Sequence, residues 1–95
     1  MPRSNIQEQA QSERIAALQA AFAEVVRNLR LTKQISQEEF AERSGLHRTY
    51  ISDIERGVRN IAFSNIVRIS EALDITVSKL MQMVERAASE PSSKQ

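Results

Sequence analysis

The chain has 95 residues, of which 41% are hydrophobic and 26% charged, with a formal net charge of +1. A chain of this length forms one small domain with a modest core. The absence of cysteine excludes disulfides and thiolate metal sites, and a single histidine makes a structural zinc site unexpected. No apolar run approaches the roughly 18 residues of a bilayer span, and no signal peptide is visible. We therefore expect a cytoplasmic protein with no membrane partner, metal or cofactor.

The chain begins with a polar extension, residues 1–11, that is rich in Gln, Ser and Asn. This extension is either disordered or part of a helix, capped by Ser4 with Gln7, that runs on into the next segment. From residue 12 onward, apolar residues recur at intervals of three and four, which predicts a helix ending near Leu31. Its early turns carry Ile15, which needs apolar cover from a partner subunit or from the last helix.

Two short amphipathic segments follow, at about residues 37–43 and 47–56. Ser36 and Glu39 have the Ser-x-x-Glu spacing of a reciprocal capping box, so they predict the start of the first helix. Gly45 lies between the segments and can adopt a left-handed turn without the penalty of a Cβ atom. The spacing is that of a helix-turn-helix.

The second of these segments has an inward face and a polar face. Ile51 and Ile54, at i and i+3, point inward. Arg48 lies at the helix start, and the opposite face presents Thr49, Ser52, Asp53 and Arg56. A second helix with Arg and polar groups near its exposed start is typical of one that enters a DNA major groove.

Two further helices are predicted after a turn over residues 57–60, where Gly57 ends the preceding helix as a C′ glycine. The first spans residues 62–73, with Ile69 at the rim of its apolar face, and is closed by Asp74. The second is capped by Thr76 or Ser78. It carries a wide apolar band whose surplus predicts a dimer interface, formed by Val77, Leu80, Met81, Met83 and Val84. We divide the chain into the extension, a domain over residues 12–88 and a loose tail over residues 89–95.

The combination of SQEEFA, SG, YISDIERG and a following helix resembles the helix-turn-helix of the Cro and phage-repressor (XRE) family of bacterial regulators. Within that family, LHRTYISDIERGVRN is most similar to the small controller proteins of restriction-modification systems. The resemblance covers residues 22–80. It implies an all-α, compact five-helix, lambda-repressor-like domain, to which this chain adds an extended N-terminal helix. It also implies a structural ion pair between Arg30 and Glu55, and the inward position of Glu55 requires a partner because an unpaired buried charge is costly.

The expected DNA contacts come from the helix-turn-helix and the turn after it. Arg48 has the fork that matches guanine O6 and N7, and Asp53 either accepts from a cytosine amino group or orients Arg48 or Arg56. Gln37 presents its amide and backbone N–H groups to a phosphate. Tyr50 either reaches a phosphate or base or packs against the domain. The full predicted set is Gln37, His47, Arg48, Thr49, Tyr50, Ser52, Asp53, Arg56, Arg59 and Asn60.

These features predict a sequence-specific transcriptional regulator that binds double-stranded DNA as a homodimer, without a small-molecule ligand. Its two recognition helices would lie about 34 Å apart on a palindromic operator. An antitoxin-like repressor is a related alternative, and a protein-interaction module without DNA binding is a more distant one. An enzyme is not expected. Ser36, His47 and Asp53 have the residue types of a catalytic triad, but the motif places the His and the Asp on a DNA-facing helix and makes the Ser a helix cap.

Overall fold

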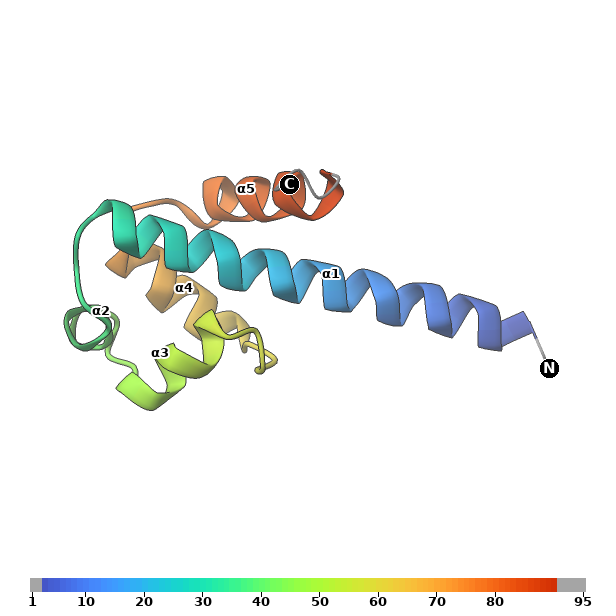
Figure 1. Ribbon diagram of the computed structural model, residues 1–95, viewed down its shortest axis with the longest axis horizontal. Coiled ribbons are helices and arrows are strands. Elements are labelled where there is room, and N and C mark those ends of the chain that lie inside the picture. The colour runs from blue at the N-terminus through green and yellow to red at the C-terminus, as the bar shows by residue number, and fades with distance from the viewer. Residues whose placement is uncertain (1–2, 91–95) are drawn as a thin grey trace.

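The computed structural model describes the backbone of residues 3–90 and the side chains of residues 5–90. Five helices make up this part of the chain: α1 (Arg3–Thr32), α2 (Gln37–Ser44), α3 (Arg48–Glu55), α4 (Phe63–Ala72) and α5 (Val77–Ser89). Helix α5 lies along one side of α1, and α3 lies against its other side (Figure 1). Helix α2 packs against both α3 and α4. The predicted all-α, five-helix fold is confirmed.

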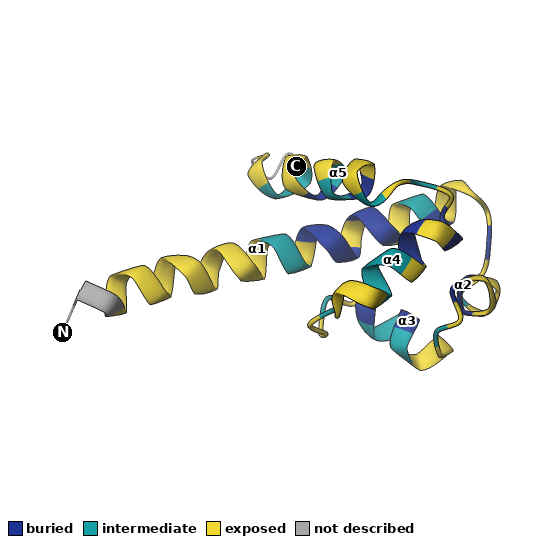
Figure 2. Ribbon diagram, turned by 180° about the vertical axis from the view of Figure 1, so that it is seen from behind, coloured by how far each residue is buried: buried dark blue, intermediate teal, exposed yellow. Residues whose placement is uncertain are grey.

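Helix α1 is one continuous helix of 30 residues. Of the two alternatives for residues 1–11, the structure has the helical one from Arg3 onward, so Ser4 lies within the helix and not before it. Residues 5–17 are exposed, and burial begins at Leu18, where α1 joins the rest of the fold (Figure 2). The projecting half explains the longest dimension of 48 Å, because an α-helix rises about 1.5 Å per residue. Ile15 is half exposed.

The core is formed by one face of every helix. Its fully buried large side chains are Val26 of α1, Phe40 of α2, Ile51 and Ile54 of α3, Ile69 of α4, and Leu80 and Val84 of α5, with Leu73 beside them. Ile69 was predicted at the rim and is instead fully buried. The buried residues of α4, which are Ile69, Ser70 and Ala72, lie in its second half, whereas Phe63, in its first turn, is 71% exposed.

The apolar band of α5 is mostly used within the subunit. Leu80 and Val84 have no exposed surface, so their prediction as dimer contacts is corrected: they pack inside the subunit. The other three members of the predicted set, Val77, Met81 and Met83, are only partly buried. Met81 lines an apolar groove of about 380 Å³ between α1, α4 and α5, and Met83 lines a second groove beside α1. Val77 and both methionines are half-buried, so they alone of the predicted set keep surface for a partner.

Local contacts determine where α2 begins, and two glycines lie where α2 and α3 end. The Ser36 hydroxyl accepts from the Glu39 backbone N–H at 3.0 Å, which is one half of the predicted capping box. The Glu39 carboxylate pairs with Arg43 at 2.8 Å instead of reaching back to Ser36. Gly45, with a φ of 75°, and Gly57, with a φ of 74°, adopt the left-handed conformation after α2 and α3. The turn geometry that orients α3 thus depends on two positions that suit glycine.

The start of α5 distinguishes between the two predicted caps. The Thr76 hydroxyl accepts from the Lys79 backbone N–H at 3.1 Å and is the N-cap side chain. Asp74, which was predicted to close α4, has a φ of 58° in the turn between α4 and α5.

Candidate nucleic-acid interface

The position of α3 is fixed at its last turn by the ion pair of Arg30 and Glu55. Arg30 donates from Nε to Glu55 Oε2 at 2.7 Å and from Nη2 to Oε1 at 3.0 Å, a bidentate arrangement. The side chains are only 11% and 3% exposed. The hydrogen bond to Glu55 raises the pKa of the Arg30 guanidinium above its ordinary value. Arg30 also donates from Nη1 to the Ile35 carbonyl at 2.8 Å, so one side chain joins α1, the α1–α2 turn and α3.

Gln37 is half-buried and contributes to the same ion-pair site. Its Nε2 donates to Glu55 Oε1 at 3.1 Å, so the amide faces inward to the ion pair. One N–H of the amide is used in this contact, and the predicted contact of Gln37 with a phosphate stays a prediction. Its backbone N–H, in the first turn of α2, still has the geometry of a helix N-terminus, where N–H groups lack intrahelical acceptors.

The start of α3 presents the predicted base reader, Arg48. His47 is the N-cap residue, and its Nδ1 accepts from the Thr49 backbone N–H at 3.4 Å. Arg48 Nε lies 3.3 Å from Glu38 Oε2, and the two side chains are 56% and 72% exposed. Glu38, on α2, is thus the partner of Arg48, and not Asp53 as one of the predicted alternatives had it.

Asp53 lies between Arg56 and Arg59. Arg56 Nη2 donates to Asp53 Oδ1 at 2.5 Å, and Arg59 Nε donates to Oδ2 at 3.2 Å. The hydrogen bond from Arg56, reinforced by Arg59, holds the pKa of the Asp53 carboxyl below its usual range. The carboxylate therefore remains ionised at neutral and mildly acidic pH, and it orients Arg56, as the second predicted alternative stated.

Tyr50 is held by residues outside α3. Its hydroxyl accepts from Asn65 Nδ2 at 2.9 Å, and the Arg59 guanidinium lies 4.8 Å from its ring centroid. Asn60, predicted as a DNA contact, accepts from Gln19 Nε2 through its side-chain oxygen, which ties the loop before α4 to α1. Asn65 was not predicted as a functional residue, because a contact between separate helices leaves no local pattern in the sequence.

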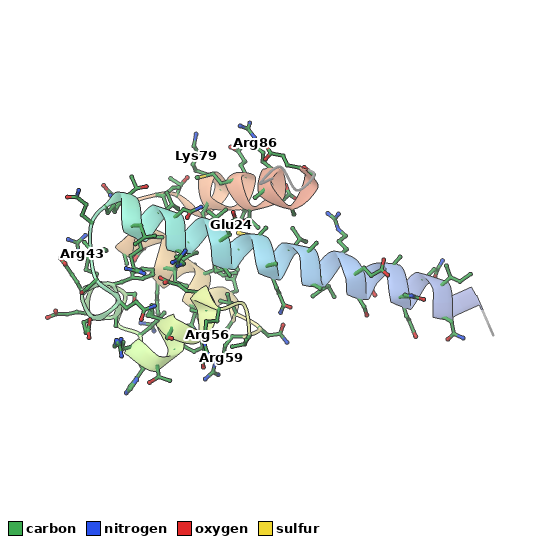
Figure 3. The ribbon with its side chains drawn as sticks, viewed as in Figure 1. Glu24, Arg43, Arg56, Arg59, Lys79 and Arg86 are labelled. Atoms are coloured by element: carbon green, nitrogen blue, oxygen red, sulfur yellow. The ribbon has the colours of Figure 1, made fainter. Side chains whose placement is uncertain are left out.

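Most of the predicted DNA contacts lie on α3, at its N-cap or in the loop that follows it. Arg56 and Arg59 project on the side of α3 away from α5, whereas Lys79 and Arg86 of α5 project in the opposite direction (Figure 3). The predicted residues on α3 or at its N-cap are His47, Arg48, Thr49, Tyr50, Ser52 and Asp53. This surface of α3 and the following loop combines exposed arginines with hydroxyl groups, which suits contact with phosphates and base edges.

Ser36, His47 and Asp53 each have a separate local contact. Ser36 caps α2, His47 caps α3, and Asp53 pairs with two arginines. Within residues 3–90, no group of three or more His, Asp or Glu side chains is placed to bind a metal ion. Over the same range, no helix has the length and apolar composition that would let it cross a membrane.

Comparison with known proteins assigns the architecture to a family. The model of a helix-turn-helix family matches residues 26–80, which includes α2 and α3 and most of the core. The chain belongs to the XRE-type helix-turn-helix family of transcriptional regulators. The control protein C.BamHI of Bacillus amyloliquefaciens is 51% identical over 61 residues, which cover 63% of this chain and 75% of the relative.

Solved structures of restriction-modification controller proteins are similar to this helix-turn-helix regulator. C.AhdI from Aeromonas hydrophila is 43% identical, with a TM-score of 0.62 over 64% of this chain and 92% of that one. The C.Esp1396I tetramer in complex with its natural 35 base-pair operator is 32% identical, with a TM-score of 0.72 over 77% of this chain and 96% of that one. The relatives are regulators, which are not enzymes.

Proposed function

We propose that this regulator binds double-stranded DNA sequence-specifically, as a homodimer on a palindromic operator, and controls transcription in a restriction-modification system. The observation that carries the proposal is the outward face of α3, where Arg48, Thr49 and Arg56 are exposed while Ile51 and Ile54 are buried. The structure of C.Esp1396I with its operator supports it, because that relative has the same fold. The names of the relatives favour a controller over an antitoxin-like repressor, and the exposed arginines argue against a module without DNA binding.

Arg48 is the proposed base reader, although it is paired with Glu38 in the free protein. An exposed ion pair is worth about 0.2–1 kcal/mol. A bidentate contact between arginine and guanine contributes about 1–3 kcal/mol of discrimination. DNA therefore outcompetes Glu38 for the guanidinium, and the pair with Glu38 serves to limit the orientations of Arg48 before binding.

Arg59→Ala tests the DNA-binding proposal through the salt dependence of affinity. A guanidinium that neutralises one phosphate releases about one counterion, so its loss is expected to reduce the slope of log affinity against log salt by about one. The measurement is fluorescence anisotropy with a labelled duplex at several salt concentrations.

Arg86→Ala is the matched control, because Arg86 projects from α5 on the opposite side of the molecule (Figure 3). It should leave the slope unchanged. Equal slopes for wild-type protein and Arg59→Ala would refute a phosphate contact by Arg59. The absence of salt-dependent binding by folded wild-type protein would refute DNA binding itself.

Met81→Glu tests the proposed homodimer. Met81 is half-buried beside the apolar groove between α1, α4 and α5, so a carboxylate there should oppose burial against a second subunit. Sedimentation equilibrium at micromolar concentration is expected to give a dimer for wild-type protein and a monomer for the variant, with unchanged helix content by circular dichroism. Ser78→Glu is the control for added charge, because Ser78 is exposed on α5, lies outside both grooves and gains the same single negative charge. A wild-type monomer with undiminished operator binding would contradict dimeric recognition.

A further inference from the structure

Tyr50 on α3 and Asn65 on α4 form a polar contact beside the proposed recognition surface. Asn65 Nδ2 donates to the Tyr50 hydroxyl oxygen at 2.9 Å, and both residues are half-buried. The ring is further constrained by Arg59, whose guanidinium lies 4.8 Å from the ring centroid. The hydroxyl is therefore held in one place by a residue that lies outside the helix-turn-helix.

The direction of this hydrogen bond determines what the hydroxyl can offer to DNA. A tyrosine hydroxyl has one proton to donate, and here its oxygen accepts from an amide. An accepted hydrogen bond also polarises the O–H group and strengthens it as a donor. Among residues 5–90, no protein group accepts from the Tyr50 hydroxyl, so its proton is available to an acceptor outside the protein.

We propose that Asn65 is a positioning residue for DNA recognition, which presents the Tyr50 hydroxyl as a donor to a DNA acceptor. This inference rests on the proposed function. The chemical class of the ligand atom is a hydrogen-bond acceptor, either a phosphate oxygen or a purine N7, guanine O6 or thymine O4 atom in the major groove. The amino groups of cytosine and adenine, which are donors, do not fit a donating hydroxyl.

The test is a double-mutant cycle of Asn65→Ala and Tyr50→Phe, with binding measured on a duplex selected by the wild-type protein. Tyr50→Phe removes the hydroxyl and keeps the ring. Each single variant is expected to bind about threefold to tenfold more weakly, which is the loss of one hydrogen bond. In the Tyr50→Phe background, Asn65→Ala is expected to change affinity no further, because Asn65 acts through the hydroxyl.

A repeated selection with each single variant distinguishes the two kinds of acceptor. Relaxed preference at one shared operator position indicates a base acceptor, and equal weakening on all sequences indicates a phosphate. The inference is supported when Asn65→Ala and Tyr50→Phe show the same one of these two results.

The inference is overturned if Asn65→Ala weakens binding equally in wild-type protein and in Tyr50→Phe, because Asn65 would then contact DNA itself. It is also overturned if Asn65→Ala does not change the affinity of wild-type protein. Should Asn65→Ala fail to fold, Asn65→Ser, whose side chain is too short to span the contact, replaces it in the same cycle. If wild-type protein selects no duplex, the proposed function fails. If wild-type protein binds specifically and the cycle is additive, only the role of Asn65 fails.

Discussion

Arg30→Ala is expected to lower the free energy of unfolding by about 3–5 kcal/mol, the usual cost of removing one partner from a buried ion pair. The substitution leaves the Glu55 carboxylate, 3% exposed, with Gln37 as its remaining side-chain donor. It also removes the donor to the Ile35 carbonyl. Thermal unfolding followed by circular dichroism should show a fall of more than about 10 °C in Tm, since 1 kcal/mol corresponds to about 4–8 °C in a domain of this size.

The matched control for Arg30→Ala is Arg43→Ala. Arg43 also forms an ion pair, with Glu39 at 2.8 Å, but its side chain is 46% exposed and its partner's is 47% exposed. An exposed i,i+4 pair contributes about 0.3–0.5 kcal/mol, so this variant should unfold close to the wild-type temperature. Equal losses of stability in the two variants would show that burial does not distinguish the Arg30–Glu55 pair.

Arg48→Ala is expected to relax the base preference at one position of each half-site, at a cost of about 1–3 kcal/mol per subunit. Non-specific binding should change much less, because Arg56 and Arg59 remain on the same surface. The measurement compares the affinities of wild-type and variant protein for a selected duplex and for duplexes that carry each other base at that position.

Glu38→Gln is the control for Arg48→Ala, because it removes the partner of Arg48 and keeps the guanidinium. It should preserve the base preference and raise overall affinity slightly, since a carboxylate near phosphates is repelled. If Arg48→Ala leaves the base preference unchanged, Arg48 is not the base reader.

The features that could be predicted from the sequence depend on short-range patterns or on a strong physical requirement. Ser36 marked the start of α2 and Gly45 marked the turn after it, because N-capping and left-handed backbone geometry each restrict the residue type. The spacing of Ile51 and Ile54 placed the inward face of α3, and both are buried. The family resemblance implied the Arg30–Glu55 pair, which the structure contains.

Side-chain contacts that depend on how the helices pack against one another could not be predicted from patterns within one helix. The width of the apolar band on α5 did not show that Leu80 and Val84 pack inside the subunit. The amide of Gln37 turns to Glu55, a residue 18 positions away, and Asn65 reaches Tyr50 across 15 positions. Such contacts follow from how the helices cross, and amphipathic periodicity within one helix carries no information about that crossing.

The most direct test of the central claim, specific DNA recognition by α3, is selection of bound duplexes from a randomised pool at moderate salt, followed by sequencing. We expect enrichment of a two-fold symmetric sequence whose half-sites are separated by about 34 Å, one turn of DNA. Folded protein that captures DNA without enriching any sequence would contradict specific recognition, and folded protein that captures no DNA would contradict DNA binding altogether.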